Sequence, residues 1–385
     1  MTSKTYCAYP FVNASLQSDN TVLPCGQFMK TSLFKNIIPI QQVRDGPVIQ
    51  DMRKKMLNDK FVEGCQCHTE EEAGFPSMRQ AGIARYGFTT DTKLRRIELV
   101  SDNVCNIKCR SCGSPYSHLW YEDEIALYGE SLLGKKYSKN TLYTDVNLAD
   151  LDEIEVLGGE PTVSPTTEDF FTRLRDAQVV KNLTIKLSTN GMSLPKNNLL
   201  YGLENCNRLD LNISVDGYKK SNDYIRSGSN FETVEQSLEF YDKLITARPV
   251  GSTVIKVHTA VSIYNVNQLY MLNDYVSSKF PRFNKTLQMV QYPVYLNVQN
   301  TPVDFKQYIS SIVQDKDILN YMFVQGQDLF GHFINFTQHL DEIRNEDISA
   351  VNPHLSDYML TYTNTISREE SKIFFLECIN QIKNN

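Results

Sequence analysis

Three cysteines lie close together on one short segment, at Cys105, Cys109 and Cys112. Three and then two residues separate them, so one loop can present three thiolates. A structural zinc site closes its coordination with four ligands, whereas thiolates also hold iron–sulfur clusters. A cubane cluster with three protein ligands keeps one iron free for another molecule. The segment therefore indicates a metal centre with an open position.

The sequence has nine cysteines, and most of them precede residue 113. An odd number of thiols in a chain of this size does not suggest a disulfide framework, and in a reducing cytosol clustered thiols more often bind metal. Cys206 and Cys378 stand apart from the others. We expect each of these two to be a small core residue.

Short apolar runs that favour strands recur from residue 95 onward. They lie at 95–100, 151–157, 183–188, 209–215, 252–261 and 285–290. Amphipathic stretches between and after them predict helices at 118–133, 167–177, 232–245 and 303–323. This alternation is typical of a parallel α/β sheet with crossover helices. The chain before about residue 90 is rich in turns and is expected to be irregular.

Polar turn motifs follow the first four expected strands. The cysteine loop follows the first strand, and "GGEP" (158–161) follows the second. "STNG" (188–191) and "SVDG" (214–217) follow the third and fourth. Parallel α/β folds build their sites at the carboxyl ends of the strands. We therefore expect these four turns to meet in one site.

Taken in this order, the motifs resemble those of the radical S-adenosylmethionine superfamily, over about residues 95–270. The resemblance implies a partial (β/α)6 TIM-like barrel and a 4Fe–4S cluster on Cys105, Cys109 and Cys112. It also implies that the free iron binds S-adenosyl-L-methionine, which is cleaved reductively to a 5′-deoxyadenosyl radical that abstracts hydrogen from a substrate. The implied cofactor contacts are Gly158, Gly159, Glu160, Asn190, Ser214, Asp216 and Arg226.

Two of these roles have a stated physical reason. Paired glycines let a backbone approach the methionine ammonium, and Arg226 suits the methionine carboxylate. "NDYIRSGSNF" also matches a family segment and adds Asp223 as a candidate. Ser111 stands where the superfamily often has an aromatic residue, and no glycine-rich motif follows the fifth strand. Contacts to adenine are therefore unassigned.

The N-terminal cysteines resemble the auxiliary-cluster modules called SPASM and twitch. Cys7 and Cys25 flank an expected hairpin in which Asn20 replaces the usual turn glycine, and asparagine tolerates that left-handed conformation. Cys65 and Cys67 lie one residue apart, where the family has two. In an extended strand both would face one side. The resemblance implies an auxiliary iron–sulfur cluster on these four thiols, with His68 as a substitute ligand. A closed zinc site is the alternative.

The order of the modules resembles a phage-associated subgroup in which the twitch module comes first. "CNIKCRSCG" around the three cysteines and a later "LDEIR" (340–344) also recur there. We expect three parts: a cysteine-rich module at 1–92, the radical barrel at 93–298, and a mostly helical segment at 299–385.

The resemblance implies an enzyme, an oxidoreductase or a peptide-modifying one. It implies a peptide or protein side chain as substrate and a flavodoxin- or ferredoxin-type reductant as partner. A small-molecule substrate (sugar, amino acid or nucleotide) is the second hypothesis. A non-catalytic metal-binding interaction protein is the third.

Composition narrows the class of protein and its cellular location. The 385 residues are 41% hydrophobic and 22% charged, enough for a full core. Net charge is -6, with no lysine or arginine run, so a nucleic-acid partner is not favoured. No apolar stretch reaches the length of a membrane span, and the start of the chain lacks a signal-peptide pattern. We expect a soluble, cytoplasmic protein.

Overall fold

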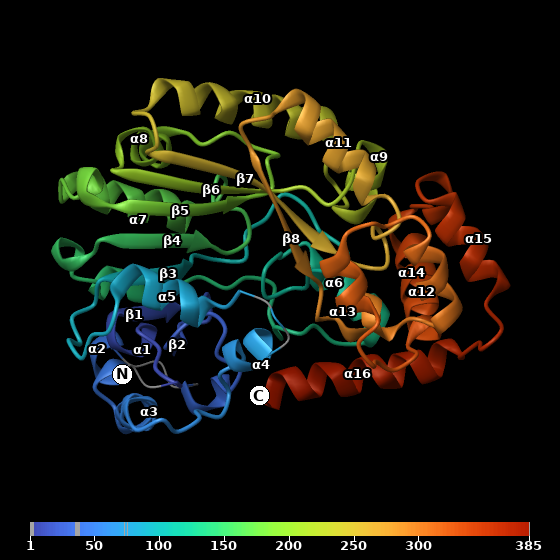
Figure 1. Ribbon diagram of the computed structural model, residues 1–385, viewed down its shortest axis with the longest axis horizontal. Coiled ribbons are helices and arrows are strands. Elements are labelled where there is room, and N and C mark those ends of the chain that lie inside the picture. Colours follow the sequence, from blue (N-terminus) through green and yellow to red (C-terminus); the bar gives the residue numbers. More distant parts are fainter. Residues whose placement is uncertain (1–3, 35–38, 73, 75, 385) are drawn as a thin grey trace.

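The computed structural model describes residues 4–34, 39–72, 74 and 76–384. The strands it describes form an eight-stranded sheet in the order β2-β1-β3-β4-β5-β6-β7-β8 (Figure 1). They are β1 (Asn13–Leu16), β2 (Val22–Leu23), β3 (Arg96–Val100), β4 (Glu153–Leu157), β5 (Thr184–Thr189), β6 (Arg208–Ser214), β7 (Thr253–Val261) and β8 (Asn284–Met289). β1 and β2 are antiparallel, and all other neighbours are parallel.

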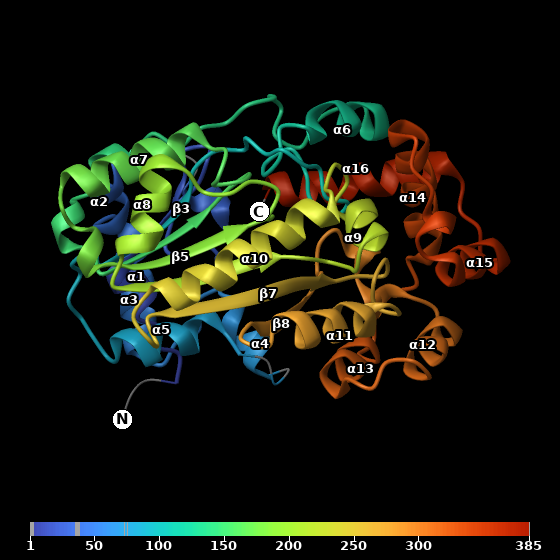
Figure 2. The same cartoon turned by 90° about the horizontal axis from the view of Figure 1, so that it is seen from above.

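The six strands expected from the sequence are confirmed as β3 to β8, each within two residues of its expected start and end. Because every pair among them is parallel, the α/β class is confirmed as well. Helices cross over between them, and α10 lies across the sheet in Figure 2.

The helices in the first half of the chain are α1 (Tyr9–Val12), α2 (Ile40–Arg44), α3 (Pro47–Leu57), α4 (Cys67–Glu72), α5 (Met78–Tyr86), α6 (Trp120–Tyr128), α7 (Pro165–Asp176) and α8 (Asn197–Asn205). Those in the second half are α9 (Lys220–Ile225), α10 (Phe231–Ala247), α11 (Leu269–Lys279), α12 (Val303–Ser310), α13 (Lys316–Met322), α14 (Phe330–Arg344), α15 (Pro353–Thr361) and α16 (Arg368–Asn384). Short 3-10 turns are η1 (Thr31–Phe34), η2 (Leu142–Asp145), η3 (Leu148–Asp150), η4 (Val180–Asn182), η5 (Val294–Leu296), η6 (Val298–Asn300) and η7 (Ile348–Ala350).

The two faces of the sheet differ in polarity. Alternate strand residues such as Ile97 and Leu99 are fully buried in the main apolar core under the helices. The residues between them face the inside of the curved sheet. There Arg96 is buried and forms an ion pair with Glu153 at 2.8 Å and another with Glu98. The inner face therefore carries charge, while the outer face supplies the core.

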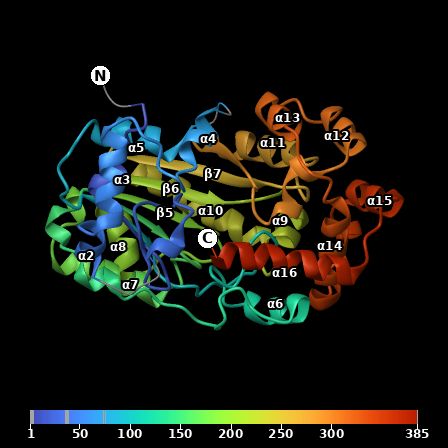
Figure 3. The ribbon, with the colours of Figure 1, turned by 90° about the horizontal axis from the view of Figure 1, so that it is seen from below.

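A second apolar core lies beside the first. It joins α6 to the C-terminal helices through buried aromatic residues, among them Trp120, Phe333 and Phe336. Figure 3 shows α16 running alongside α6 and α14, and residues of these three helices are in contact. The C-terminal helices therefore pack directly against the element that follows the cysteine loop.

The expectation that the N-terminal region is irregular is wrong. It contains α1 to α5, and its hairpin extends the barrel sheet, since β1 pairs with β3 in parallel with Ala14 opposite Ile97. The hairpin itself is confirmed: Asn20 has a φ of 71° in the turn between β1 and β2.

The single helix expected at 303–323 is two helices. Asp315 ends the connection between α12 and α13, and its carboxylate accepts the N–H groups of Asp317 and Ile318. Aspartate favours this N-cap position, so it starts a new helix. The helix expected at 118–133 is shorter, because Gly129 adopts the left-handed conformation that ends α6.

None of the described helices combines the length and the apolarity needed to cross a membrane.

Candidate active site

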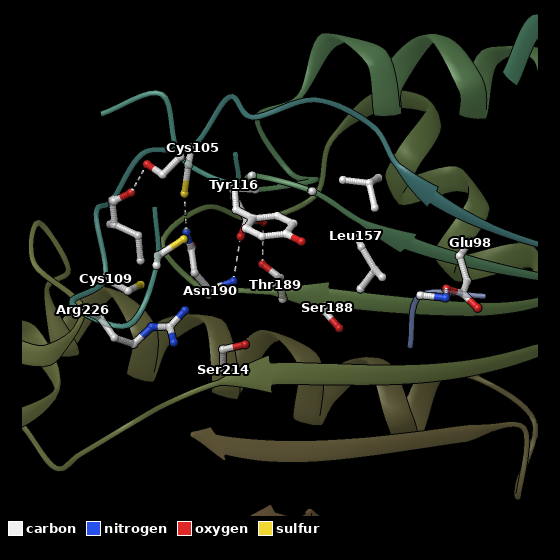
Figure 4. Close-up of a pocket in the computed structure, with 18 of the residues that line it drawn as sticks. Glu98, Cys105, Cys109, Tyr116, Leu157, Ser188, Thr189, Asn190, Ser214 and Arg226 are labelled. Atoms are coloured by element: carbon white, nitrogen blue, oxygen red, sulfur yellow. Dashed lines mark hydrogen bonds between the residues drawn. The ribbon is translucent and has the colours of Figure 1, made fainter. Parts of the chain in front are cut away.

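A cavity of about 330 Å³ opens at the carboxyl ends of the strands (Figure 4). The residues expected to bind metal or cofactor that line it are Cys105, Cys109, Cys112, Gly158, Gly159, Glu160, Asn190, Ser214 and Arg226. They come from turns after β3, β4, β5 and β6 and from the end of α9. The turns therefore meet as the parallel topology predicts. In Figure 4, Cys109 and Arg226 lie at one end of the cavity and Glu98 at the other.

The three thiols of the loop face this cavity without a disulfide among them. Cys105 is buried, and burial raises the pKa of its thiol to about 12. The amide nitrogen of Asn190 lies 3.8 Å from its sulfur. A metal must displace the thiol protons when it binds. The donor set fits a cluster held by three thiolates.

The glycine pair packs against the segment that leads into the cysteine loop. Gly158 has a φ of +134°. A Cβ on Gly159 would lie 2.2 Å from the carbonyl oxygen of Val104. The N–H of Gly159 donates to the Asp102 carbonyl, and that of Glu160 donates to the Val104 carbonyl, both at 2.8 Å. Both glycines are therefore required by contact between two backbones, a reason that the sequence alone did not reveal.

Glu160 connects this turn to the next strand. Its carboxylate accepts hydrogen bonds from the hydroxyl of Thr189 at 2.7 Å, the N–H of Asn190 at 2.7 Å and the hydroxyl of Thr162 at 2.7 Å. Burial raises the pKa of this carboxyl group. Since its oxygens are engaged with the protein, Glu160 holds the end of β5 in place beside the cavity.

Arg226 points into the cavity with part of its guanidinium free. One nitrogen pairs with Asp216 at 2.7 Å, and its Nε is buried without a hydrogen-bond partner among the described residues. Asp216 lies behind it, outside the lining residues, and accepts the N–H of Ala260 at 2.8 Å. A buried donor that lacks a partner is costly, so Arg226 fits an anionic ligand in the cavity. Asp223 does not line the cavity.

Arg110, inside the cysteine loop, fixes that loop to the C-terminal helices. Its side chain is fully buried, pairs with Asp341 and Glu346, and lies 3.7 Å from the ring centre of Tyr224. Its Nε donates to the Tyr224 carbonyl at 3.1 Å. Asp341 also accepts from the Tyr224 hydroxyl. The loop therefore stays in place through a residue more than 220 positions away.

A second contact comes from the other end of the same motif. Arg344 donates to the carbonyl of Lys108 at 2.9 Å, pairs with Asp123 at 2.9 Å and stacks 4.4 Å from the ring centre of Trp120. The indole of Trp120 donates to the carbonyl of Cys109 at 2.9 Å. The two motifs "CNIKCRSCG" and "LDEIR" thus contact each other directly. We refer to Arg110, Asp341, Arg344 and Glu346 as the loop clamp.

The N-terminal cysteines surround a second, smaller cavity of about 20 Å³. All four, Cys7, Cys25, Cys65 and Cys67, line it. Burial raises the pKa of the Cys7 and Cys65 thiols to about 12. His68 lines the cavity too. The four cysteines that were expected to share one metal centre therefore lie around one cavity.

The extended strand expected for Cys65 and Cys67 is wrong. Cys65 forms an isolated bridge with Phe28, whereas Cys67 is the first residue of α4. Acidic residues in the first turn favour a helix start there, and α4 has Glu70 in that position. Among the described residues, no three histidine, cysteine, aspartate or glutamate side chains have the arrangement expected around a single metal ion. The metal assigned to each group of thiols stays a prediction.

Sequence reasoning missed two features of the site. Tyr116 is the one aromatic side chain on the cavity wall among the described residues. Its place after the third cysteine was the available signal. The loop clamp was also missed, although both of its motifs had been noted, because no sequence rule pairs residues so far apart.

A scan against protein-family models found no match, and a search of curated proteins found none either. Solved structures did match. Native anSMEcpe with bound AdoMet and Cp18Cys peptide is 18% identical, with 57% of this chain and 58% of that chain covered and a TM-score of 0.36.

Two further matches have 12% identity and cover 76% of this chain. Streptococcus suis SuiB bound to S-adenosylmethionine is covered over 64% of its length, with a TM-score of 0.34. The radical S-adenosylmethionine methyltransferase TsrM from Kitasatospora setae, with cobalamin and a 4Fe–4S cluster bound, is covered over 61%, with a TM-score of 0.35. The chain spans less than two thirds of the length of each of these three structures.

Proposed function

We propose that this chain is a radical S-adenosylmethionine enzyme that abstracts hydrogen from a side chain of a peptide or protein. One observation carries the proposal. Three thiols of one loop and the turns after three neighbouring strands line a single cavity, and a buried arginine donor in it has no hydrogen-bond partner among the described residues.

Each wall of the cavity has a role in this proposal. Cys105, Cys109 and Cys112 hold a 4Fe–4S cluster, which when bound supplies the electron that cleaves a C–S bond of S-adenosylmethionine. Arg226 binds the methionine carboxylate through its free N–H. The glycine turn, held by its own backbone contacts, presents a surface without side chains to the ammonium group.

Tyr116 takes the place of the missing aromatic residue. Ser111, where that residue stands in the family, lines a different cavity and not the main one. Tyr116 lies on the wall of the main cavity near Asn190 (Figure 4). Aromatic side chains bind nucleobases by stacking. We assign Tyr116 to the adenine ring.

The N-terminal thiols belong to the same proposal as an auxiliary iron–sulfur site. Four free thiols line one small cavity there. Free clustered thiols are characteristic of reducing compartments, which supports activity in the cytoplasm with a flavodoxin- or ferredoxin-type reductant as electron donor.

The test is reductive cleavage of S-adenosylmethionine by protein purified and reconstituted without oxygen. With dithionite, the wild type should release 5′-deoxyadenosine, measured by chromatography, and Cys109→Ala should release none, because two thiolates hold a cluster poorly. Cys378→Ala, a change at a half-buried thiol far along the chain, is the matched control and should behave as wild type. Full cleavage by Cys109→Ala would overturn the proposal.

A further inference from the structure

A cleft runs along the open side of the sheet, apart from the cavity already described. It consists of two adjoining cavities of about 570 Å³ and 350 Å³. The residues that line both are Gln27, Glu70, His258, Gln288, Met289 and Gln291. One wall is therefore the N-terminal segment, and the other is formed by β7, β8 and the residues after β8.

The cleft follows the free edge of β8. Among the described strands, β8 pairs with β7 alone. Leu287, Gln288 and Met289 are consecutive and all line the cleft. Consecutive residues of a strand point to opposite faces, so the cleft reaches around the edge of β8. His258 and Ala260 of β7 line it too, so it also covers one face of the last two strands.

The backbone of β8 has donors that face this edge. The N–H of Val290 donates to Val261 of β7 at 2.9 Å. Backbone groups alternate in direction along a strand, so the N–H groups of Leu287 and Met289 point away from β7, toward the cleft. An extended chain placed there would find hydrogen-bond partners along its length.

The charges on the walls are mostly acidic. Glu70, Asp315 and Asp317 line the cleft, and no arginine does within the part of the chain that the structure describes. The one lysine, Lys285, donates from its ammonium to the hydroxyl of Ser277 at 2.7 Å and so is engaged by α11. A phosphate or another strongly anionic group would be repelled, whereas a lysine or arginine side chain would be attracted.

The uncharged part of the lining suits a polypeptide. It carries the amides Gln27, Gln66, Gln288 and Gln291 and the methionines Met29, Met78 and Met289. Side-chain amides match the donors and acceptors of a peptide backbone, and methionine adapts its shape to varied side chains.

The cleft also reaches residues next to both groups of cysteines. Ser111, next to Cys112, lines one part of it, and so does Gln66, which lies between Cys65 and Cys67. A chain bound in the cleft would therefore pass from the N-terminal thiols to the loop that opens onto the main cavity.

We propose that this cleft binds an extended peptide segment with lysine or arginine side chains, which adds to the sheet as a further strand beside β8. The inference rests on the proposed function and deepens it, because it selects a basic peptide over a phosphorylated small molecule as the substrate class.

The probes are fluorescein-labelled decapeptides. Their binding to the reconstituted full chain is measured at moderate salt by fluorescence anisotropy. One alternates lysine and threonine, and a second alternates glutamate and threonine. A third is the lysine peptide with every second backbone nitrogen methylated. The lysine peptide should bind about tenfold more tightly than the glutamate peptide, since the cleft is acidic. Backbone methylation should weaken its binding about tenfold, since strand addition uses backbone hydrogen bonds.

Two variants and one control locate the binding. Glu70→Gln with Asp317→Asn should weaken the lysine peptide about fivefold by removing charge from the cleft, while Asp176→Asn, at an exposed carboxylate on α7, should leave its affinity unchanged. Leu287→Pro should also weaken binding, because it removes an edge-facing donor and keeps the bonds to β7.

Equal binding of the two charged peptides would overturn the proposal, and so would full binding of the methylated one. Cleavage of S-adenosylmethionine without any peptide is measured on the same samples. Its absence would overturn the proposed function and leave the peptide result standing, whereas normal cleavage without peptide discrimination would overturn the cleft alone.

Discussion

The two groups of cysteines differ in the size of the cavity that each group lines. Cys105, Cys109 and Cys112 open onto a cavity of about 330 Å³ with a free arginine donor, whereas the four N-terminal thiols surround about 20 Å³. Metal sites that bind a reacting molecule keep a coordination position open. In metal sites that have a structural or electron-relay role, protein ligands fill every position. The difference supports the proposal that the chemistry takes place at the first group and that the second group has a supporting role.

The contacts that hold the two groups of cysteines in place differ as well. The cysteine loop is fixed from a distance by the loop clamp on α14. The N-terminal thiols depend on nearby contacts, such as Arg79, which pairs with Glu71 and donates to the Tyr6 carbonyl beside Cys7. The open site, which has fewer ligands of its own, therefore has the more extensive outside support.

The largest expected effect comes from a substitution that removes a ligand from the N-terminal group and leaves the cysteine loop intact. Cys67→Ala should abolish the substrate reaction, while cleavage of S-adenosylmethionine stays within about twofold of wild type, because the two cavities share no thiol. Iron should fall from about eight atoms per chain to about four if both centres are cubanes. Iron analysis and the 5′-deoxyadenosine assay measure this. A zinc atom with about four irons would show that the N-terminal centre is a zinc site.

The next effect concerns the loop clamp. Arg110→Met should lower the free energy of unfolding by about 3–5 kcal/mol, because it leaves the carboxylates of Asp341 and Glu346 without their buried partner. The urea midpoint and the iron content of the loop should both fall. Arg282→Met, which removes an exposed pair with Asp242, is the matched control, with an expected loss of about 0–1 kcal/mol. An unchanged midpoint for Arg110→Met would show that the cysteine loop is held without the clamp.

A smaller effect concerns the wall of the open site. Tyr116→Ala should weaken S-adenosylmethionine about tenfold, in line with the loss of one stacking contact, and Tyr116→Phe should bind as wild type. Methionine alone, which lacks adenine, should bind equally to all three proteins. Calorimetric titration measures each affinity. A parallel loss of methionine binding would assign Tyr116 to the loop and not to adenine.

The smallest effect lies in the hairpin between the two groups. Asn20→Ala should lower the free energy of unfolding by about 1 kcal/mol, since alanine disfavours the left-handed turn and loses a hydrogen bond. The side chain of Asn20 accepts the N–H of Thr141 at 2.7 Å. Asn20→Gly keeps the turn and isolates the loss of that bond. Urea unfolding of the three proteins measures both contributions, and equal stability of Asn20→Ala and wild type would contradict this account.

Local patterns in the sequence were enough to predict the six barrel strands and the cysteine loop. Alternation of apolar residues marks each strand, and turn residues mark its end. Parallel topology then requires the turns after β3, β4, β5 and β6 to meet, which is why Gly158, Asn190 and Ser214 could be expected near the cysteine loop before any coordinates. Arg226, at the end of α9, was expected there only from the family resemblance.

Other features depend on contacts between distant segments, and only the tertiary structure decided them. The sequence shows that Arg96 and Glu98 alternate with apolar residues, yet it cannot say whether they face solvent or the inside of the barrel. The pairing of β1 with β3, the clamp between Arg110 and Asp341, and the cleft beside β8 each join residues many positions apart. No repeating pattern in the sequence predicts such contacts, because they depend on packing across the whole fold and not on local geometry.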